Sequence, residues 1–270
     1  MITAARLSGK GSCWLVAALS IVLLAGCVTT TDSRFAREAD KIKIVENYIQ
    51  LATAYIGQNN LDRARFHLER ATKIAPENPQ VLATRGLVLQ AEGEAELAER
   101  SYREAIDNDE GYTRGRVYYG AFLFSRGRFE EARVQFAAAS RDTEYKDRAS
   151  VFYNLGRTYE ELEKPAEAAT AYKRSLDLSR GNTEAILALS RALANSGDYA
   201  EASRYYSYLM DLMDKNPNLR HSPQSLITGI RIAYHLGDQN RVSSLGLLLK
   251  SDFPDSLEYQ QYKVLIADGQ

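Results

Sequence analysis

Alanine returns along most of this 270-residue chain at a nearly constant spacing. The intervals between successive members of the series are 34, 34, 36 and 34 residues. The series consists of Ala64, Ala98, Ala132, Ala168 and Ala202. A period of this length predicts a repeated supersecondary unit, which has to stack on its neighbours because it cannot bury its apolar face alone. We therefore expect a solenoid in which one helix contact recurs once per unit.

Further columns share this period and predict the form of the unit. Small residues form one column: Ala52, Gly86, Gly120, Gly156 and Ser190. Large apolar residues form another: Leu68, Tyr102, Phe136, Tyr172 and Tyr206. Turn residues lie between the two: Asn59, Gly93, Gly127 and Gly197, with residues 163–165 in that place in the fourth unit. This order predicts two antiparallel helices, A and B, in which small side chains permit close approach and large ones fill the space between units.

The pattern resembles the tetratricopeptide repeat. We place six repeats at 45–78, 79–112, 113–146, 149–182, 183–216 and 223–256, followed by a C-terminal capping helix over 257–270. The sixth repeat is degenerate, as terminal repeats often are, because Val242 and Gly246 stand in the alanine and large-residue columns. No run of alternating β-branched residues competes with the helical pattern. The expected fold class is all-α, a right-handed superhelical solenoid of antiparallel helix pairs.

Residues 1–26 have the layout of a bacterial export signal. Arg6 and Lys10 precede an apolar stretch over 13–24 that is short for a stable transmembrane helix. The stretch runs into Leu-Ala-Gly-Cys at 24–27, which resembles the lipobox of bacterial lipoproteins. This resemblance implies cleavage before Cys27 and acylation of its sulfur. The alternative is an ordinary signal peptide with an incidental cysteine.

The lipoprotein resemblance also predicts where the chain is held. Residues 27–44 are expected to form the lipidated cysteine and a tether, flexible over its polar start at 28–40. Several acyl chains on Cys27 would anchor it to a membrane durably. Aspartate after the cysteine usually retains such proteins in the inner membrane, and here the residue is Val28. The resemblance thus implies an outer-membrane lipoprotein that faces the periplasm.

Composition and motifs disfavour several classes of function. The 34 basic and 35 acidic residues leave a net charge of −1, so we expect no nucleic-acid partner. The two cysteines and three histidines are scattered, which disfavours a metal site, and His67 and His221 are expected to be solvated or partly packed rather than to act as bases. The chain also lacks the glycine-rich, serine-elbow and zinc-binding motifs of common enzymes. We expect no catalytic site, cofactor or metal, and we interpret acidic residues such as Glu92 and Glu99 as a solvated face.

Segments spread along the chain resemble the PilF/PilW family of type IV pilus biogenesis lipoproteins, called pilotins. They include GCVT at 26–29, YIQLATAY at 48–55, YGAFLFSRGRFEEA at 119–132, KPAEAATAYKRSL at 164–176, SLITGIRIA at 225–233 and SLEYQQYK at 256–263. The resemblance implies six tetratricopeptide repeats, outer-membrane lipidation, no catalysis, and a role in escorting the subunits of the pilus secretin to the outer membrane, where they multimerise. A general periplasmic scaffold for envelope or cell-wall enzymes, or a structural subunit of the pilus machine, stays open as an alternative.

The repeat register predicts a partner-binding groove. Positions 2, 5, 9, 12 and 13 of each repeat should line the concave surface. In repeats 1 to 3 they give apolar residues: Ile49, Ile56, Ala83, Leu87, Val117, Ala121 and Phe124. In repeats 4 to 6 they give an arginine ladder, Arg157, Arg191 and Arg231, with Tyr153, Glu160, Leu187 and Tyr234 nearby. We expect the apolar half to bind the secretin and the ladder to be secondary, since exposed apolar patches usually mark interfaces.

Each half of this groove has a plainer alternative. Tilted helices would bury the apolar residues, and Glu160 or Glu161 could neutralise Arg157 locally. The ligand is expected to be an amphipathic helix or an extended segment. Without it, the protein is expected to be a monomer.

Overall fold

The computed structural model describes residues 34–267, and it gives their side chains from residue 38 onward. This part of the chain forms 13 helices and no strand. The chain divides into two units, 1–44 and 45–270. Of the first unit, the structure describes only the beginning of helix α2.

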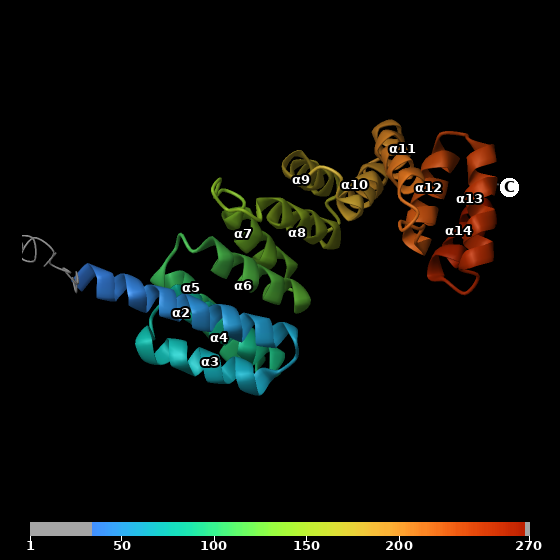
Figure 1. Ribbon diagram of the computed structural model, residues 1–270. Coiled ribbons are helices and arrows are strands. Elements are labelled where there is room, and N and C mark those ends of the chain that lie inside the picture. Colours follow the sequence, from blue (N-terminus) through green and yellow to red (C-terminus); the bar gives the residue numbers. More distant parts are fainter. Residues whose placement is uncertain (1–33, 268–270) are drawn as a thin grey trace, which may run out of the picture. The chain divides into compact units, whose positions relative to one another are not determined.

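The helices follow one another as antiparallel pairs, with one further helix at the end (Figure 1). The pairs are α2 (Arg34–Gly57) with α3 (Leu61–Ile74), α4 (Pro79–Ala91) with α5 (Ala95–Asn108), α6 (Thr113–Ser125) with α7 (Phe129–Ala139), α8 (Arg148–Glu161) with α9 (Pro165–Leu178), α10 (Thr183–Asn195) with α11 (Tyr199–Lys215), and α12 (Pro223–His235) with α13 (Gln239–Asp252). The final helix is α14 (Leu257–Ala267). Each helix B also contacts the helix A of the following pair, as α7 does with α8 and α9 with α10.

Helix α2 begins earlier than the sequence pattern predicts. Residues 34–44, which we expected to belong to the tether, are helical. This segment contains alanine, arginine, glutamate and lysine and has no glycine or proline, so its intrinsic helix propensity is high. From Arg34 onward the segment predicted as a tether is therefore helical rather than flexible, and residues 28–33 lie outside the described part of the chain.

The turns between paired helices adopt the backbone conformation that the turn column predicts. Asn59 and Glu163 have φ of 56°, and Gly93, Gly127 and Gly197 have φ between 72° and 88°. Side chains cap the N-termini of several of the helices that follow these turns. Asn60 accepts from the Arg63 amide at 3.2 Å, and Asp198 and Asp238 do the same for the first turns of α11 and α13.

The alanine and small-residue columns are the close contacts of the solenoid. All five alanines of the 34-residue series are 0% exposed. A methyl group added at Gly86 would lie 2.5 Å from the Tyr102 ring, so only glycine fits against this aromatic residue. Tyr102 also reaches the next repeat, where its ring centroid is 6.1 Å from that of Tyr119 and 5.6 Å from that of Phe122. The large column thus packs within its own helix pair and against the following one.

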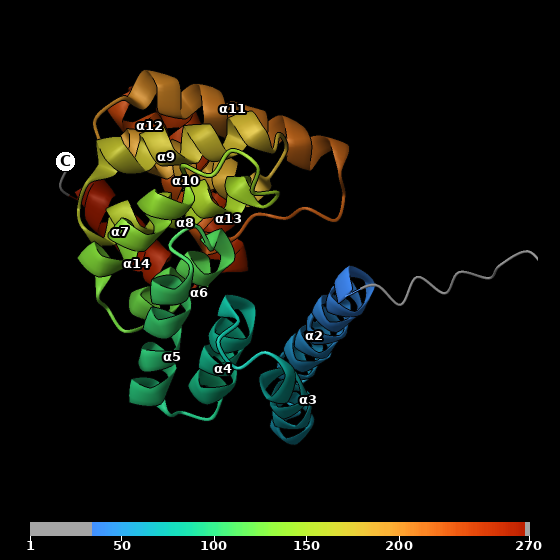
Figure 2. The same cartoon turned by 90° about the vertical axis from the view of Figure 1, so that its left-hand side faces the viewer.

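The degenerate sixth repeat is completed by the last helix. Gly246 stands in the large-residue column of α13, and the Tyr262 ring of α14 fills its place, 2.4 Å from where a Cβ on Gly246 would be. Tyr259, Tyr262 and Leu265 of α14 pack against the core of α9 to α13. Figure 2 shows the succession of helices from a second direction. The predicted fold class, an all-α solenoid of helix pairs, is confirmed.

Candidate partner-binding surface

The five large apolar residues predicted for the groove lie on three A helices, and all five are partly buried. Ile49 and Ile56 of α2 pack against the core that α2 and α3 share with α4. Leu87 of α4 and Val117 and Phe124 of α6 pack against the core of α5 to α9. Leu87, Val117 and Phe124 therefore belong to one cluster, and Ile49 and Ile56 belong to another. Each residue leaves only part of its surface for a partner.

Two small residues of the same register differ from each other. Ala121 of α6 is exposed. Ala83 of α4 is 0% exposed and packs with Leu82 and Ala105, so its assignment to the groove is wrong. The reason is that α4 contacts helices on several sides, α3, α5 and α6. The position of a residue within the repeat does not show on how many sides its helix is packed against other helices.

The three arginines of the ladder lie in three different environments. Arg157 of α8 is exposed, and its guanidinium carbon lies 4.8 Å from the ring centroid of Phe124. This is the geometry of a cation–π contact. It joins the apolar half of the predicted groove to the first arginine. Arg231 of α12 is partly buried and lines a groove beside α14.

Arg191 is held in an ion pair with the preceding repeat. Its Nε and Nη2 donate to Glu160 at 2.9 and 2.7 Å, and the Tyr172 hydroxyl donates to the same carboxylate at 2.6 Å. The side chains of Arg191 and Glu160 are only 27% and 17% exposed. Burial opposes the charge on Arg191, but the Glu160 carboxylate outweighs it and raises the pKa of the guanidinium. Burial and Glu160 also raise the pKa of the Tyr172 hydroxyl.

This pairing decides against the alternative in which Glu160 neutralises Arg157. The carboxylate bonds to Arg191 of the next repeat and not to Arg157, its neighbour on α8. Arg191 is consequently neutralised, whereas Arg157 remains exposed. The ladder does not present three equivalent cations to a ligand.

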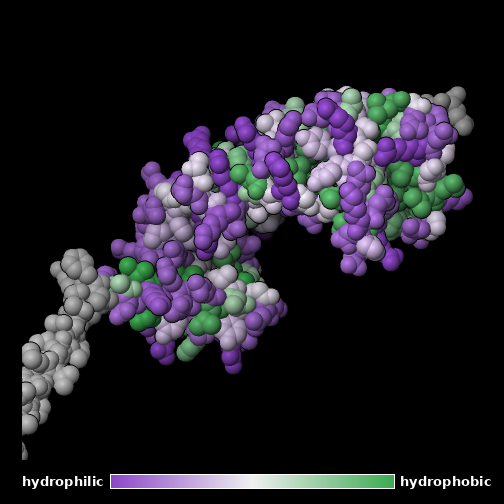
Figure 3. All heavy atoms as spheres, turned by 45° about the horizontal axis from the view of Figure 1, so that its top comes forward, coloured by the Kyte–Doolittle hydropathy of each residue, from purple (hydrophilic) through white to green (hydrophobic). Residues whose placement is uncertain are grey.

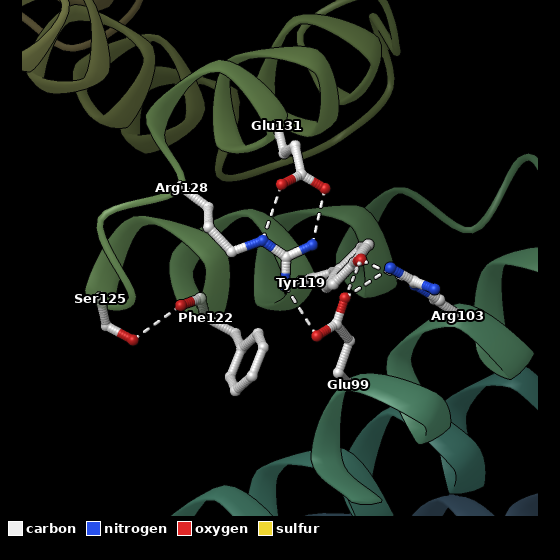
Figure 4. A network of polar contacts seen from close by, with 7 residues as sticks. All are labelled: Glu99, Arg103, Tyr119, Phe122, Ser125, Arg128 and Glu131. Atoms are coloured by element: carbon white, nitrogen blue, oxygen red, sulfur yellow. Dashed lines mark hydrogen bonds and ion pairs between the residues drawn. The ribbon is translucent and has the colours of Figure 1, made fainter. Parts of the chain in front are cut away.

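A second network joins repeats 2 and 3 (Figure 4). The Glu99 carboxylate of α5 accepts from Arg128 at 2.7 Å, from the Tyr119 hydroxyl at 2.9 Å and from Arg103 at 2.6 Å. Arg128 also binds both oxygens of Glu131, at 2.7 and 2.6 Å. The hydrogen bond from Arg128 is the main cause that lowers the pKa of Glu99. Glu99 therefore connects α5 to α6 and to the residue that precedes α7, and it is not simply a solvated carboxylate, as the sequence interpretation had it.

Sequence reasoning missed these contacts between repeats, although their spacing carries a signal. The ion pairs join residues 27 to 34 positions apart, which is about one repeat. They are Arg65 with Glu92, Glu99 with Arg128, Glu130 with Lys164, Glu160 with Arg191, and Lys173 with Glu201. A search for opposite charges one repeat apart would have found them. Exposed pairs of this kind contribute little individually, but here they recur at successive junctions.

The remaining predicted features are placed as follows. His67 stacks on Tyr55 with ring centroids 5.4 Å apart, and His221 Nδ1 lies 3.1 Å from Ser225 Oγ, where burial lowers the pKa of the imidazole. Across residues 34–267, the histidine, cysteine and acidic side chains form no group of three or more that could hold a metal ion. Cys27 lies outside the described residues. None of the described helices combines the length and apolarity needed to cross a bilayer.

Comparison with known families agrees with this geometry. Models of the tetratricopeptide repeat match residues 45–78, 113–181 and 159–220. Matches and structure together define the chain as a tetratricopeptide repeat protein, a class whose stacked helix pairs form extended binding surfaces. The crystal structure of PilW, a type IV pilus biogenesis factor, shares this fold with a TM-score of 0.65 over 81% of this chain and 97% of that one, at 24% identity.

A closer relative identifies the family. The type IV pilus assembly protein PilF of Pseudomonas aeruginosa is 34% identical over 246 residues, which is 91% of this chain and 95% of that protein. A structure from the functional characterisation of Pseudomonas aeruginosa pilF covers 83% of this chain and 99% of its own, with 33% identity and a TM-score of 0.71. The chain belongs to the PilF family of type IV pilus proteins.

Proposed function

We propose that this protein acts in type IV pilus biogenesis as a pilotin. In this role, it is an outer-membrane lipoprotein that binds subunits of the pilus secretin and promotes their localisation and multimerisation in the outer membrane. The observation that carries the proposal is the likeness to PilF, a type IV pilus assembly protein, over 91% of this chain. Stacked helix pairs form extended binding surfaces, which suits a role in binding other proteins.

The proposed anchor is Cys27. The tetrapeptide at 24–27 and Val28 support acylation and transport to the outer membrane. Cys27→Ser removes the thiol that would form the thioether, so the variant should lose labelled fatty acid and leave the outer-membrane fraction. Fractionation after feeding a labelled fatty acid measures both. An acylated serine variant in the outer membrane would contradict the anchor.

The proposed secretin-binding surface is the apolar half of the groove. Leu87, Val117 and Phe124 share one cluster and are partly exposed, and Arg157 extends the surface by lying over Phe124. Ile49 and Ile56 would extend it towards repeat 1, while Arg191 and Arg231 belong to the secondary half. An apolar partner side chain that packs on Leu87 would remove its own surface and the exposed part of Leu87 from water. Anchors of this kind contribute about 2–4 kcal/mol each, which is a factor of roughly 30 to 1,000 in affinity.

Binding of the secretin to purified variants tests this surface. Leu87→Gln places a polar amide where the partner must be desolvated, so we expect a large loss of affinity. Leu178→Gln is the matched control, because Leu178 is 50% exposed at the end of α9 and lies outside the proposed surface. Melting curves separate lost binding from lost folding, since Leu87 also packs on the core.

Three results would redirect the proposal. Equal secretin binding by Leu87→Gln and Leu178→Gln would rule out this half of the groove. A wild-type chain that retrieves cell-wall enzymes and no secretin would favour the general scaffold. Stable stoichiometric association with finished secretin rings would favour a structural subunit over a transient escort.

A further inference from the structure

The last helix closes the solenoid with one face and leaves the other apolar. Tyr259, Tyr262 and Leu265 of α14 pack inward. Leu257 and Val264, however, are 70% and 60% exposed. A helix that serves only as a cap is expected to have a polar outer face, because that face meets water. Figure 3 shows hydrophobic side chains gathered over the C-terminal helices of the solenoid. Sealing the core therefore does not account for the composition of α14.

A groove lies between α12 and α14. It has a volume of about 520 Å³ and is lined by Ile227, Arg231, Leu257, Gln260, Gln261, Val264 and Leu265. Four of these seven residues are apolar, two are neutral amides, and one carries a charge. We call this feature the α12–α14 groove. Its size suits several side chains of a polypeptide segment.

Arg231 gives the α12–α14 groove its charge preference. Within the described residues, the guanidinium makes no ion pair, and no carboxylate lies within 4 Å of it. It is partly buried beside Ile227 and Leu265. A guanidinium that is partly removed from water gains from a carboxylate that it can bind in a bidentate manner. This complementarity favours a ligand with an acidic side chain next to apolar ones.

The walls of the groove decide the conformation of the ligand. Both α12 and α14 are helices, whose backbone groups are occupied by their own hydrogen bonds. An extended segment would bring a row of unpaired amides and carbonyls that find only Gln260, Gln261 and Arg231 as partners, whereas a helix satisfies its own backbone. Leu257 and Val264 are seven residues apart, about 10.5 Å along α14, which matches two turns of a bound helix.

We infer that the α12–α14 groove binds an amphipathic helix of the partner protein, with apolar side chains against Leu257 and Val264 and a carboxylate side chain on Arg231. The inference depends on the proposed function only for the identity of that partner, the pilus secretin. It adds a second contact to the apolar half of the main groove, at the opposite end of the series of repeats.

Affinity measurements with the purified secretin subunit test the groove. Val264→Glu should weaken binding at least tenfold by placing a charge against apolar side chains, and Arg231→Glu should do the same by repelling the carboxylate. The matched controls are Val134→Glu on α7, where Val134 is 50% exposed, and Arg174→Glu on α9, where the side chain is 68% exposed. Both controls should bind within about twofold of wild type. Val264, Val134 and Arg174 are exposed and Arg231 is only partly buried, so the melting curves of all four variants should stay close to that of wild type.

Crosslinking identifies the ligand independently. A photoreactive residue at position 264 should label secretin peptides of an acidic amphipathic helix, and replacing the acidic residue of that helix by lysine should restore binding to Arg231→Glu. If wild type binds the secretin and the groove variants bind equally well, the inference fails while the proposed function stands. Labelling of a second copy of this chain at position 264 would also overturn the inference. If wild type binds no secretin, the proposed function fails and the inference falls with it.

Discussion

Gly156→Ala tests the close contact between the small and large columns most sharply. A methyl group at this position would lie 2.6 Å from the Tyr172 ring, although ordinary contacts begin at 3.4 Å. The ring cannot swing aside, because Tyr172 is 0% exposed and its hydroxyl is bound to Glu160, which is held in turn by Arg191. We expect an overpacking cost of about 2–3 kcal/mol against a helix-propensity gain of about 1 kcal/mol, hence a net loss of about 1–2 kcal/mol.

Two other glycines supply a graded control. A methyl group at Gly120 would lie 2.9–3.1 Å from the Phe136 ring, which has no hydroxyl to fix it, so the loss should be smaller. Gly57 has nothing within 4 Å of its added methyl, so Gly57→Ala should leave stability unchanged or raise it by up to about 1 kcal/mol. Urea unfolding followed by helical circular dichroism should give decreasing stability in the order Gly57→Ala, Gly120→Ala, Gly156→Ala.

The first repeat suggests how the clash is relieved. There, Ala52 and Leu68 stand where Gly156 and Tyr172 stand in repeat 4. The double variant Gly156→Ala/Tyr172→Leu should therefore be more stable than the sum of its single changes predicts, with a coupling of about 1 kcal/mol. The reasoning is refuted if Gly156→Ala raises the unfolding midpoint as Gly57→Ala does, or if the double-mutant cycle shows no coupling.

Further predictions concern a charge, a register position and two buried hydroxyls. The pKa of Glu99 is lowered in the folded state, so the charged carboxylate stabilises the fold above the ordinary pKa of 4.5. This contribution is lost as the pH falls through the pKa of the folded state. Between about pH 5 and pH 3, Glu99→Gln should therefore lose less stability than wild type in urea titrations. Ala98→Leu should lower the free energy of unfolding by about 1–3 kcal/mol in melting experiments, because Ala98 is 0% exposed. Ala95→Leu should lower it less. The reverse order would indicate that the repeat register is shifted. Tyr172→Phe should destabilise by about 1.5–3 kcal/mol because it loses the bond to a carboxylate, whereas Tyr206→Phe should not, because the buried Tyr206 hydroxyl has no partner among the described residues. Burial raises the pKa of Tyr206 to about 12, so this comparison holds at neutral pH, and equal losses in the two variants would contradict it.

The fold could be predicted from the sequence because its strongest contacts recur. A pair such as Gly86 and Tyr102 leaves a small and a large residue 16 positions apart in each of several repeats, and the alanine series fixes the register. The beginning of α2 could not be predicted in this way. Residues 34–44 precede the first repeat, so no period covers them, and only their helix propensity marks them.

The surface could be predicted less completely. The register gives the direction of Leu87 and Ala83 on α4, but how deeply each is buried depends on the helices around α4, so one remains partly exposed and the other is fully enclosed. Arg191 and Glu160 lie 31 residues apart, and a reading of one helix at a time does not connect them. The α12–α14 groove was missed because the repeat period ends before α14, which leaves no register from which to place Val264.

The central claim is that this protein brings the pilus secretin to the outer membrane and promotes its multimerisation. The most direct measurement is the distribution of secretin multimers between the inner and outer membranes of cells with and without the protein. The account predicts that cells without it have few multimers in the outer membrane, with unassembled or misplaced secretin subunits in their stead, and that wild-type protein restores the normal distribution. Unchanged secretin multimers in the outer membrane of cells that lack the protein would contradict the account.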